Sequence, residues 1–253
     1  MRVTILNSSP RKNGVTTALL ELLVEGMHSE GAAVEKLDLY DFKIKFCDGC
    51  FQCWYQHPGV CKIKDDFNDI YKTLIGSDLV IIASPIYGMM INGILKTFFD
   101  RMSMVSHLPD FVLDENSSKM VKPMYDQLPP VAVLLIGNMA GREIFNASTH
   151  FISEYFRITN TDVLASILRH QSELLIKPIL EAKKSEIFNA MKDAGRELIK
   201  LGKILPETQV KIEQDMLNMK DFIHGHNIFW KICVRKNLAP LKVNFDQYPI
   251  LKM

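Results

Sequence analysis

Four of the five cysteines lie within one stretch of fifteen residues, in the pattern Cys47-x2-Cys50-x2-Cys53-x7-Cys61. Unlinked thiols rarely crowd together in this way. Four sulfurs that can reach one point can bind an iron–sulfur cluster or a zinc ion, and they can also pair as disulfides. In a reducing compartment such a group binds a metal or does redox chemistry more often than it forms structural disulfides.

The distribution of apolar residues and the net charge favour a reducing, cytoplasmic compartment. The N-terminal apolar run is too short for a signal peptide, and the longest apolar runs, Leu79–Ala83 and Val131–Gly137, are far below the length of a membrane span. The 253 residues carry a formal net charge of +1, which favours neither nucleic acid nor an anionic membrane surface. We therefore expect a cytoplasmic protein with no nucleic-acid partner and no membrane partner.

A second group of polar residues, Ser8–Thr17, lies between an apolar run and an amphipathic segment. Backbone N–H groups at the start of a helix are unpaired and favour an anion, and the hydroxyls of Ser9, Thr16 and Thr17 would add donors for a phosphate. The segment is neither a P-loop nor a Rossmann glycine triplet, because Gly14 is its only glycine. The alternative is an ordinary helix cap, which would need only one hydroxyl.

The third group, Pro85–Gly93, follows an apolar run that reads as a buried strand. In open α/β sheets, ligands bind beyond the carboxyl ends of the strands. Gly88 and Gly93 permit close approach of the backbone to a ligand, while Tyr87 and Met89 suit a flat ring. The alternative is a strand-to-helix turn whose Tyr and Met side chains belong to the core.

The elements that would position these groups alternate between strand and helix. Five strands interleaved with helices imply a parallel sheet that is covered on both faces. Asp65 and Asp66 are expected to start a helix, as capping or solvated charges. The expected strands are 2–7, 34–39, 79–84, 131–137 and 162–169, and the expected helices are 15–29, one from 65, 92–104, 142–157, one through 187–205, and 210–219.

The pattern changes near residue 206. We expect a main domain over residues 1–205 that contains the cysteine loop 47–61, and a C-terminal helical and extended arm over residues 206–253. Aromatic residues of this arm favour a role in packing or in a dimer contact. They are Phe222, Phe229, Trp230, Phe245 and Tyr248. A long irregular connection, 107–130, is expected inside the main domain.

Together the two loops resemble those of the flavodoxin-like NAD(P)H-dependent FMN reductases. Ser9-Pro10-Arg11-Lys12-Asn13-Gly14 is similar to the phosphate loop of that family, and Ser84-Pro85-Ile86-Tyr87 is similar to its ring-binding loop. The resemblance covers roughly residues 2–205. It implies a flavodoxin-like, doubly wound, five-stranded parallel sheet with the order 2-1-3-4-5 and helices on both faces.

The resemblance also implies which residues bind FMN. The phosphate would be held by Ser9, Arg11, Asn13, Val15, Thr16 and Thr17. Val15 departs from the family pattern, in which a polar residue is common, and can offer only its backbone N–H. The ribityl chain and the isoalloxazine ring would be lined by Pro85, Ile86, Tyr87, Gly88 and Met89, and closed on the far side by Gly137 and Asn138.

The cysteine pattern resembles that of the iron–sulfur flavoproteins, which belong to the same superfamily and carry a 4Fe–4S cluster beside FMN. The resemblance makes Cys47, Cys50, Cys53 and Cys61 the cluster ligands. Other flavin reductases of this superfamily carry a similar loop with no cluster demonstrated. A cluster, a zinc ion, and free or redox-active thiols therefore stay open as alternatives.

Three functions follow from these readings. The first is an FMN-dependent oxidoreductase that transfers electrons from NAD(P)H to a quinone, a flavin or a protein, with no catalytic acid or base assigned because the flavin carries the chemistry. The second is an iron–sulfur flavoprotein that carries electrons from ferredoxin. The third is a non-catalytic protein with a zinc loop. The resemblance also implies a homodimer or a higher homo-oligomer.

Overall fold

The computed structural model describes residues 1–105, 112–113, 120–121 and 127–240. Its centre is a parallel sheet with the order β2-β1-β3-β7-β8, to which a short antiparallel strand, β4, is added at β3. In chain order this is 2-1-3-4-5, so the predicted topology is confirmed. The strands are β1 Arg2–Asn7, β2 Ala33–Asp38, β3 Leu79–Tyr87, β4 Met90–Ile91, β7 Val131–Ile136 and β8 Val163–Arg169.

Two hydrophobic cores lie on opposite faces of the sheet, because successive side chains of a strand point to opposite faces. In β3, Val80 and Ile82 belong to one core, whereas Leu79 and Ile81 belong to the other. Such a strand must be apolar on both faces, and β3 is buried from Leu79 to Ile86. This explains why its sequence shows a continuous apolar run without alternation.

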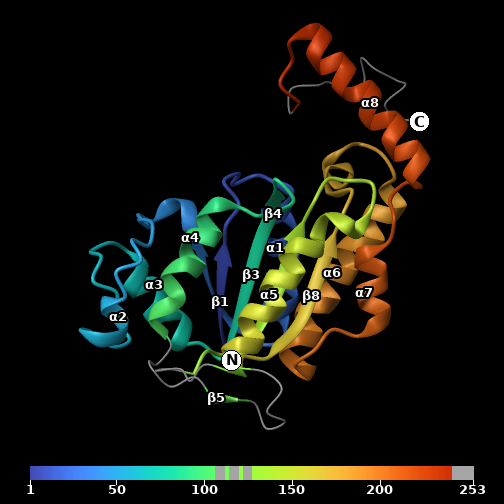
Figure 1. Ribbon diagram of the computed structural model, residues 1–253. Helices are drawn as coiled ribbons and strands as arrows, with labels where there is room; N and C mark the ends of the chain where they lie inside the picture. The colour runs from blue at the N-terminus through green and yellow to red at the C-terminus, as the bar shows by residue number, and fades with distance from the viewer. Residues whose placement is uncertain (106–111, 114–119, 122–126, 241–253) are drawn as a thin grey trace.

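Helices cover both faces of the sheet (Figure 1). The helix α1 and the helix α6 pack against each other on one face, and the remaining helices of the main domain cover the other. A Cβ atom on Gly195 of α6 would lie 2.1 Å from the Leu23 carbonyl oxygen of α1, so the two backbones are in close contact. The helices are α1 Val15–Ser29, α2 Gln52–Tyr55, α3 Phe67–Ile75, α4 Gly93–Arg101, α5 Asn146–Ile158, α6 Glu181–Leu201, α7 Pro206–Glu213 and α8 Met219–Lys236.

Short 3-10 helices and one small hairpin complete the described structure. The 3-10 helices are η1 Leu39–Asp41, η2 Met102–Val105, η3 Arg142–Phe145 and η4 Ser172–Ile176. Within the connection 107–130, β5 Val112–Leu113 pairs with β6 Met120–Val121. The rest of that connection up to residue 126, and the arm from residue 241 with Phe245 and Tyr248, lie outside the described residues.

The third strand is longer than predicted. It continues through Tyr87 and turns back into β4, so the expected end at Ser84 is wrong. The two residues of the turn, Gly88 and Met89, have φ values of +55° and +67°, which is the backbone that a tight two-residue hairpin requires. The glycine adopts it freely, whereas Met89 does so at a cost.

The helix predicted over residues 210–219 is also wrong. The chain is helical from Pro206 to Glu213, extended at Gln214, and helical again from Met219. The break is held by the end of β8, because Nη1 of Arg169 donates to the carbonyl oxygens of Ile212 and Gln214, at 2.8 and 2.6 Å. Both carbonyls thus accept a side-chain hydrogen bond in place of a helical one.

In the part of the chain that the structure describes, no helix is both long enough and apolar enough to cross a membrane.

Candidate functional site

A cavity of about 170 Å³ lies at the carboxyl ends of the parallel strands. This edge of the sheet is where α/β proteins of this topology bind ligands. The cavity brings together the loop after β1 and the start of α1, the ends of β3 and β7, and the loops after β7 and β8. It is lined by Ser9, Arg11, Gly14, Val15, Thr16, Pro85, Ile86, Tyr87, Ile136, Asn138, Ser172 and Glu173. The two loops singled out in the sequence therefore do face one space.

The loop after β1 is shaped by its own hydrogen bonds. Oγ of Ser9 accepts from the Arg11 N–H at 3.3 Å, and the Arg11 carbonyl accepts from the Gly14 N–H at 3.1 Å. Gly14 is the N-cap of α1, and no side chain caps this helix. The first amides of α1, from Val15 and Thr16, thus start a helix beside the cavity with the positive end of its dipole towards it. The N-cap is a glycine, so none of the hydroxyls of this segment serves as the N-cap side chain.

Five of the predicted flavin-binding residues do not line the cavity. Asn13 is exposed, and Gly88 and Met89 are exposed in the hairpin turn. Thr17 is buried, and its hydroxyl donates to the Arg11 carbonyl at 3.2 Å, so it shapes the loop from behind. Gly137 is buried beneath the rim, where its N–H donates to the Arg169 carbonyl at 3.0 Å.

Four residues that line the cavity were not among the predicted flavin-binding residues. Gly14 belongs to the predicted phosphate loop, whereas Ile136, Ser172 and Glu173 were missed altogether. The Glu173 N–H donates to Oδ1 of Asn138 at 3.3 Å, and its carboxylate lies 3.9 Å from the Arg11 guanidinium. Arg11 and Glu173 thus face each other across the cavity. Ser172 and Glu173 follow the fifth strand. Because the carboxyl ends of all parallel strands lie at the ligand-binding edge of the sheet, this position in the sequence could have identified them.

Asn92 ties the two loops together. Its side-chain amide donates to the Ser8 carbonyl, and its N–H donates to Oγ of Ser84 at 3.4 Å. Its side-chain oxygen accepts from the Leu95 N–H, which makes it the N-cap of α4. Because Asn92 is buried, these bonds fix the start of α4 relative to the cavity.

The four cysteines of the loop 47–61 are free thiols. Cys47 is exposed, and Cys50, Cys53 and Cys61 are half-buried. Burial raises the pKa of the Cys53 thiol to about 11, and the charges of Cys61 and Cys50 add to the shift. The charges of neighbouring thiols thus act on Cys53. Among the described residues, however, no three His, Cys, Asp or Glu side chains are arranged to hold a metal ion.

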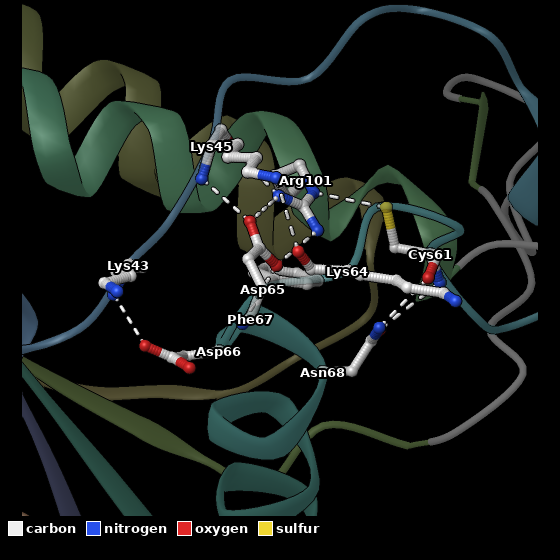
Figure 2. Close-up of polar contacts among 9 residues, drawn as sticks. All are labelled: Lys43, Lys45, Cys61, Lys64, Asp65, Asp66, Phe67, Asn68 and Arg101. Atoms are coloured by element: carbon white, nitrogen blue, oxygen red, sulfur yellow. Dashed lines mark hydrogen bonds and ion pairs between the residues drawn. The ribbon is translucent and has the colours of Figure 1, made fainter.

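A buried ion pair lies beside Cys61 (Figure 2). Nη1 and Nη2 of Arg101, the last residue of α4, donate to the two carboxylate oxygens of Asp65 at 2.7 and 3.1 Å. Nε of the same guanidinium donates to Sγ of Cys61 at 3.2 Å. The side chains of Arg101 and Asp65 are 0% and 1% exposed, so the expectation of a solvated charge at Asp65 is wrong. The expectation of a capping charge is met in part, because Oδ1 of Asp65 accepts from the N–H of Phe67, the first residue of α3, at 3.2 Å.

Asp65 stays ionised because its oxygens are fully used. Burial alone would raise the pKa of this carboxyl, but hydrogen bonds from Arg101 and from the N–H groups of Lys45 and Phe67 lower it below its usual range. Asp66, next to it, accepts from the Lys43 N–H at 2.6 Å. The two carboxylates thus bind residues 43–45 to the start of α3.

The strand order and the ligand-binding edge define a flavodoxin-like α/β protein. Residues 1–141, more than half of the chain, match the family model described as NADPH-dependent FMN reductase. The chain belongs to the NADPH-dependent FMN reductase family.

Named relatives divide into two kinds. An iron-sulfur flavoprotein of Archaeoglobus fulgidus is 34% identical over 109 residues, which are 43% of this chain and 49% of that protein. An NAD(P)H-dependent FAD/FMN reductase of Geobacillus thermodenitrificans is 26% identical over 121 residues, which are 47% of this chain and 61% of that protein. The chain thus spans about half the length of the iron–sulfur flavoproteins that it matches.

Solved structures share the fold at low sequence identity. An NAD(P)H:quinone oxidoreductase from Methanothermobacter marburgensis superposes with a TM-score of 0.59 at 16% identity, over 78% of this chain and 96% of that one. An azoreductase from Bacillus anthracis gives a TM-score of 0.57 at 12% identity, over 79% of this chain and 98% of that one. These similarities confirm the flavodoxin-like fold.

Proposed function

We propose that this protein is an FMN-dependent oxidoreductase that takes electrons from NAD(P)H and passes them to a quinone, a flavin or a protein. The observation that carries this proposal is the cavity in which the uncapped start of α1 meets the end of β3, Pro85–Tyr87. FMN, when bound, supplies hydride acceptance and electron release. Membership of the NADPH-dependent FMN reductase family supports the same activity.

The chain's own residues would bind and orient the flavin. Ser9, Arg11 and the first amides of α1 present donors and positive charge to a phosphate. Pro85, Ile86, Tyr87 and Asn138 would lie along the ribityl chain and the ring. A cavity of about 170 Å³ is smaller than the roughly 300 Å³ or more of a full ligand pocket. The ring would therefore extend over the exposed side chains of Tyr87 and Met89.

Comparing FMN with riboflavin tests the phosphate site, because the two differ only in that group. Arg11→Gln is expected to weaken FMN binding roughly tenfold, about the value of one charge-assisted hydrogen bond, and to leave riboflavin binding unchanged. Lys12→Gln is the matched control, since Lys12 pairs with Asp41 and does not line the cavity. Flavin fluorescence quenching gives both dissociation constants. Equal losses for the two flavins in the Arg11 variant would contradict the assignment.

A second candidate, an iron–sulfur flavoprotein that carries electrons from ferredoxin, is favoured by the cysteine loop. Four free thiols are the donor set of a 4Fe–4S cluster, and several relatives are named iron-sulfur flavoproteins. Binding would require Cys47, Cys50 and Cys53 to draw together with Cys61. The cluster would serve as a single-electron centre beside the flavin.

Analysis of anaerobically purified protein for iron, sulfide and zinc separates the candidates. Matching iron and sulfide would support the carrier, and reduction by ferredoxin that is faster than reduction by NAD(P)H in stopped flow would establish it. Flavin without iron, with oxidation of a nicotinamide, would leave the plain oxidoreductase. Zinc without iron and no flavin on reconstitution would instead support a non-catalytic zinc-loop protein.

The free thiols suit a reducing compartment, and we propose that the protein is cytoplasmic.

A further inference from the structure

We propose that Arg101 is a positioning residue that fixes the sulfur of Cys61 and raises the reduction potential of the cluster held by the cysteine loop. This inference rests on the proposed iron–sulfur function. The contact that carries it is the hydrogen bond from Nε of Arg101 to Sγ of Cys61, at 3.2 Å (Figure 2). Residues that donate to ligand sulfurs orient them and tune the potential of a metal centre.

Cys61 is held at three points. The side chain of Asn68 accepts from the Cys61 N–H at 3.3 Å and donates to the Cys61 carbonyl at 3.0 Å. Arg101 holds the sulfur. The position of this thiol is therefore set by α3 and α4 before any metal binds, whereas Cys47 is exposed on the outer part of the loop. A ligand that is preorganised in this way anchors the centre that assembles on it.

The Arg101 side chain is itself fixed by its contacts, so its Nε–H bond points only towards Cys61. Its guanidinium carbon lies 4.5 Å from the centre of the Phe67 ring, and Nη1 also donates to the Lys45 carbonyl at 2.9 Å. Both terminal nitrogens are committed to Asp65. A lysine has no planar fork and could not bind Asp65 on two sides while donating to a sulfur from a third nitrogen.

The helix that carries Arg101 also connects the two sites. It begins at Asn92, which donates to the Ser8 carbonyl beside the flavin cavity, and ends at Arg101, which donates to Cys61. The nine residues of α4 span about 13 Å at 1.5 Å per residue. Arg101 therefore fixes Cys61 at a set distance from the flavin cavity, as electron transfer between two centres requires.

Redox titration of anaerobically purified holoprotein tests the inference. Arg101→Gln and Arg101→Lys are each expected to make the midpoint potential of the cluster more negative, because both lose the N–H···S bond that stabilises the reduced, more negative state. Lys96→Gln is the matched control. It removes a positive charge from the same helix at an exposed ion pair with Asp100 and is expected to leave the potential unchanged.

A single change at Arg101 leaves Asp65 buried without its partner, which by itself destabilises the fold. The double variant Asp65→Asn/Arg101→Gln removes both charges together and separates loss of the sulfur contact from loss of the fold. Flavin content, iron and sulfide are measured on each sample. A potential equal to that of the wild type in a double variant with full iron and sulfide would overturn the inference.

Failure of the proposed function has a different signature. Wild-type protein without iron and sulfide would overturn the iron–sulfur function, and the effect on potential with it. In metal-free protein, the NMR signal of the Arg101 Nε–H reports the contact directly and is expected to shift in Cys61→Ser. An unshifted signal would overturn the positioning of Cys61 whether or not a cluster exists.

Discussion

Asp65 carries its charge where water does not reach, and four N–H donors, from Arg101, Lys45 and Phe67, replace the lost solvation. Its pKa in the folded state lies below the ordinary value of about 4. Stability from this group is therefore present above pH 4 and is lost as pH falls through the lowered folded pKa. Asp65→Asn should cost about 3–5 kcal/mol at pH 7, because it leaves the Arg101 charge buried without a partner.

Urea denaturation of Asp65→Asn at pH 7 and at several values below pH 4 measures this cost. The difference from the wild type should shrink as the pH falls, since the wild-type carboxyl is then protonated. Asp69→Asn is the control, because the Asp69 side chain is 85% exposed. A penalty for the Asp65 variant that does not change with pH would show that the ionised carboxyl is not its source.

The strand pattern predicted the cavity at the carboxyl ends of the strands but not the ion pair between Asp65 and Arg101, and the reason is physical. Carboxyl ends of parallel strands must share an edge, so Ser9 and Pro85 could be placed together from the strand pattern alone. Asp65 and Arg101 are separated by 36 positions, and no periodicity links a loop carboxylate to the last residue of a helix. The pairing depends on how α3 and α4 pack, which a single sequence does not specify.

At the scale of elements, the contact between α1 and α6 depends on two glycines. A Cβ atom on Gly195 would lie 2.1 Å from a carbonyl oxygen of α1, and one on Gly26 would lie 2.0 Å from the Lys192 carbonyl oxygen. Backbone atoms cannot rotate away as a side chain can. Gly195→Ala is therefore expected to destabilise the protein by about 1–3 kcal/mol through overpacking, although alanine is the better helix former.

Gly225 provides the matched control, because it lies in α8 and a Cβ atom there would meet nothing within 4 Å. Gly225→Ala should be neutral or stabilising by up to about 1 kcal/mol. Denaturant midpoints of the two variants measure the contrast. Equal effects would mean that α1 and α6 can separate at little cost.

The helices of the C-terminal region differ from the helix predicted there. Apolar spacing alone suggested a helix over 210–219, yet the chain is extended at Gln214 and helical on both sides. Pro206 at the start of α7 and Asn218 as the cap of α8 are local signals that were legible in the sequence. The bonds from Arg169 that hold the break are long-range and were not.

For the whole molecule, the segment after α7 is fastened to the sheet through a histidine. His170 is 1% exposed and its Nε2 lies 2.6 Å from the Asp215 carboxylate. Burial lowers the pKa of His170, against the opposing effect of Asp215. The unfolded chain thus takes up a proton near pH 6.5 that the folded protein resists, and stability should decrease as pH falls from about 6.5 through the lowered folded pKa.

The thermal midpoint of His170→Asn, followed between pH 8 and pH 5, checks this dependence. The variant should lose part of the decrease seen in the wild type on the acid side. His150→Asn, which changes an exposed histidine of α5, should keep the full decrease. Parallel curves for wild type and His170→Asn would show that His170 titrates alike in both states.

Helix α8 is the candidate for the predicted dimer contact. Helix α8 stands away from the layers of sheet and helices (Figure 1) and exposes large apolar side chains, with Trp230 43% and Val234 77% exposed. If a second copy covers this face, Trp230→Lys should convert the oligomer to a monomer in sedimentation velocity at micromolar concentration. Lys220→Ala, an exposed position on the same helix, should leave the sedimentation coefficient unchanged.

Helix α4 also sets a limit on how this chain can change. Its first turn is fastened at Asn92 and its last residue at Cys61, and each residue turns the helix by about 100°. Insertion or deletion of a single residue between them would swing Arg101 away from the thiol while leaving the cap intact. The number of residues in α4 is thus constrained by geometry, whereas a substitution leaves that number unchanged. Lineages with this cysteine loop should vary the exposed face of the helix readily and its residue count hardly at all.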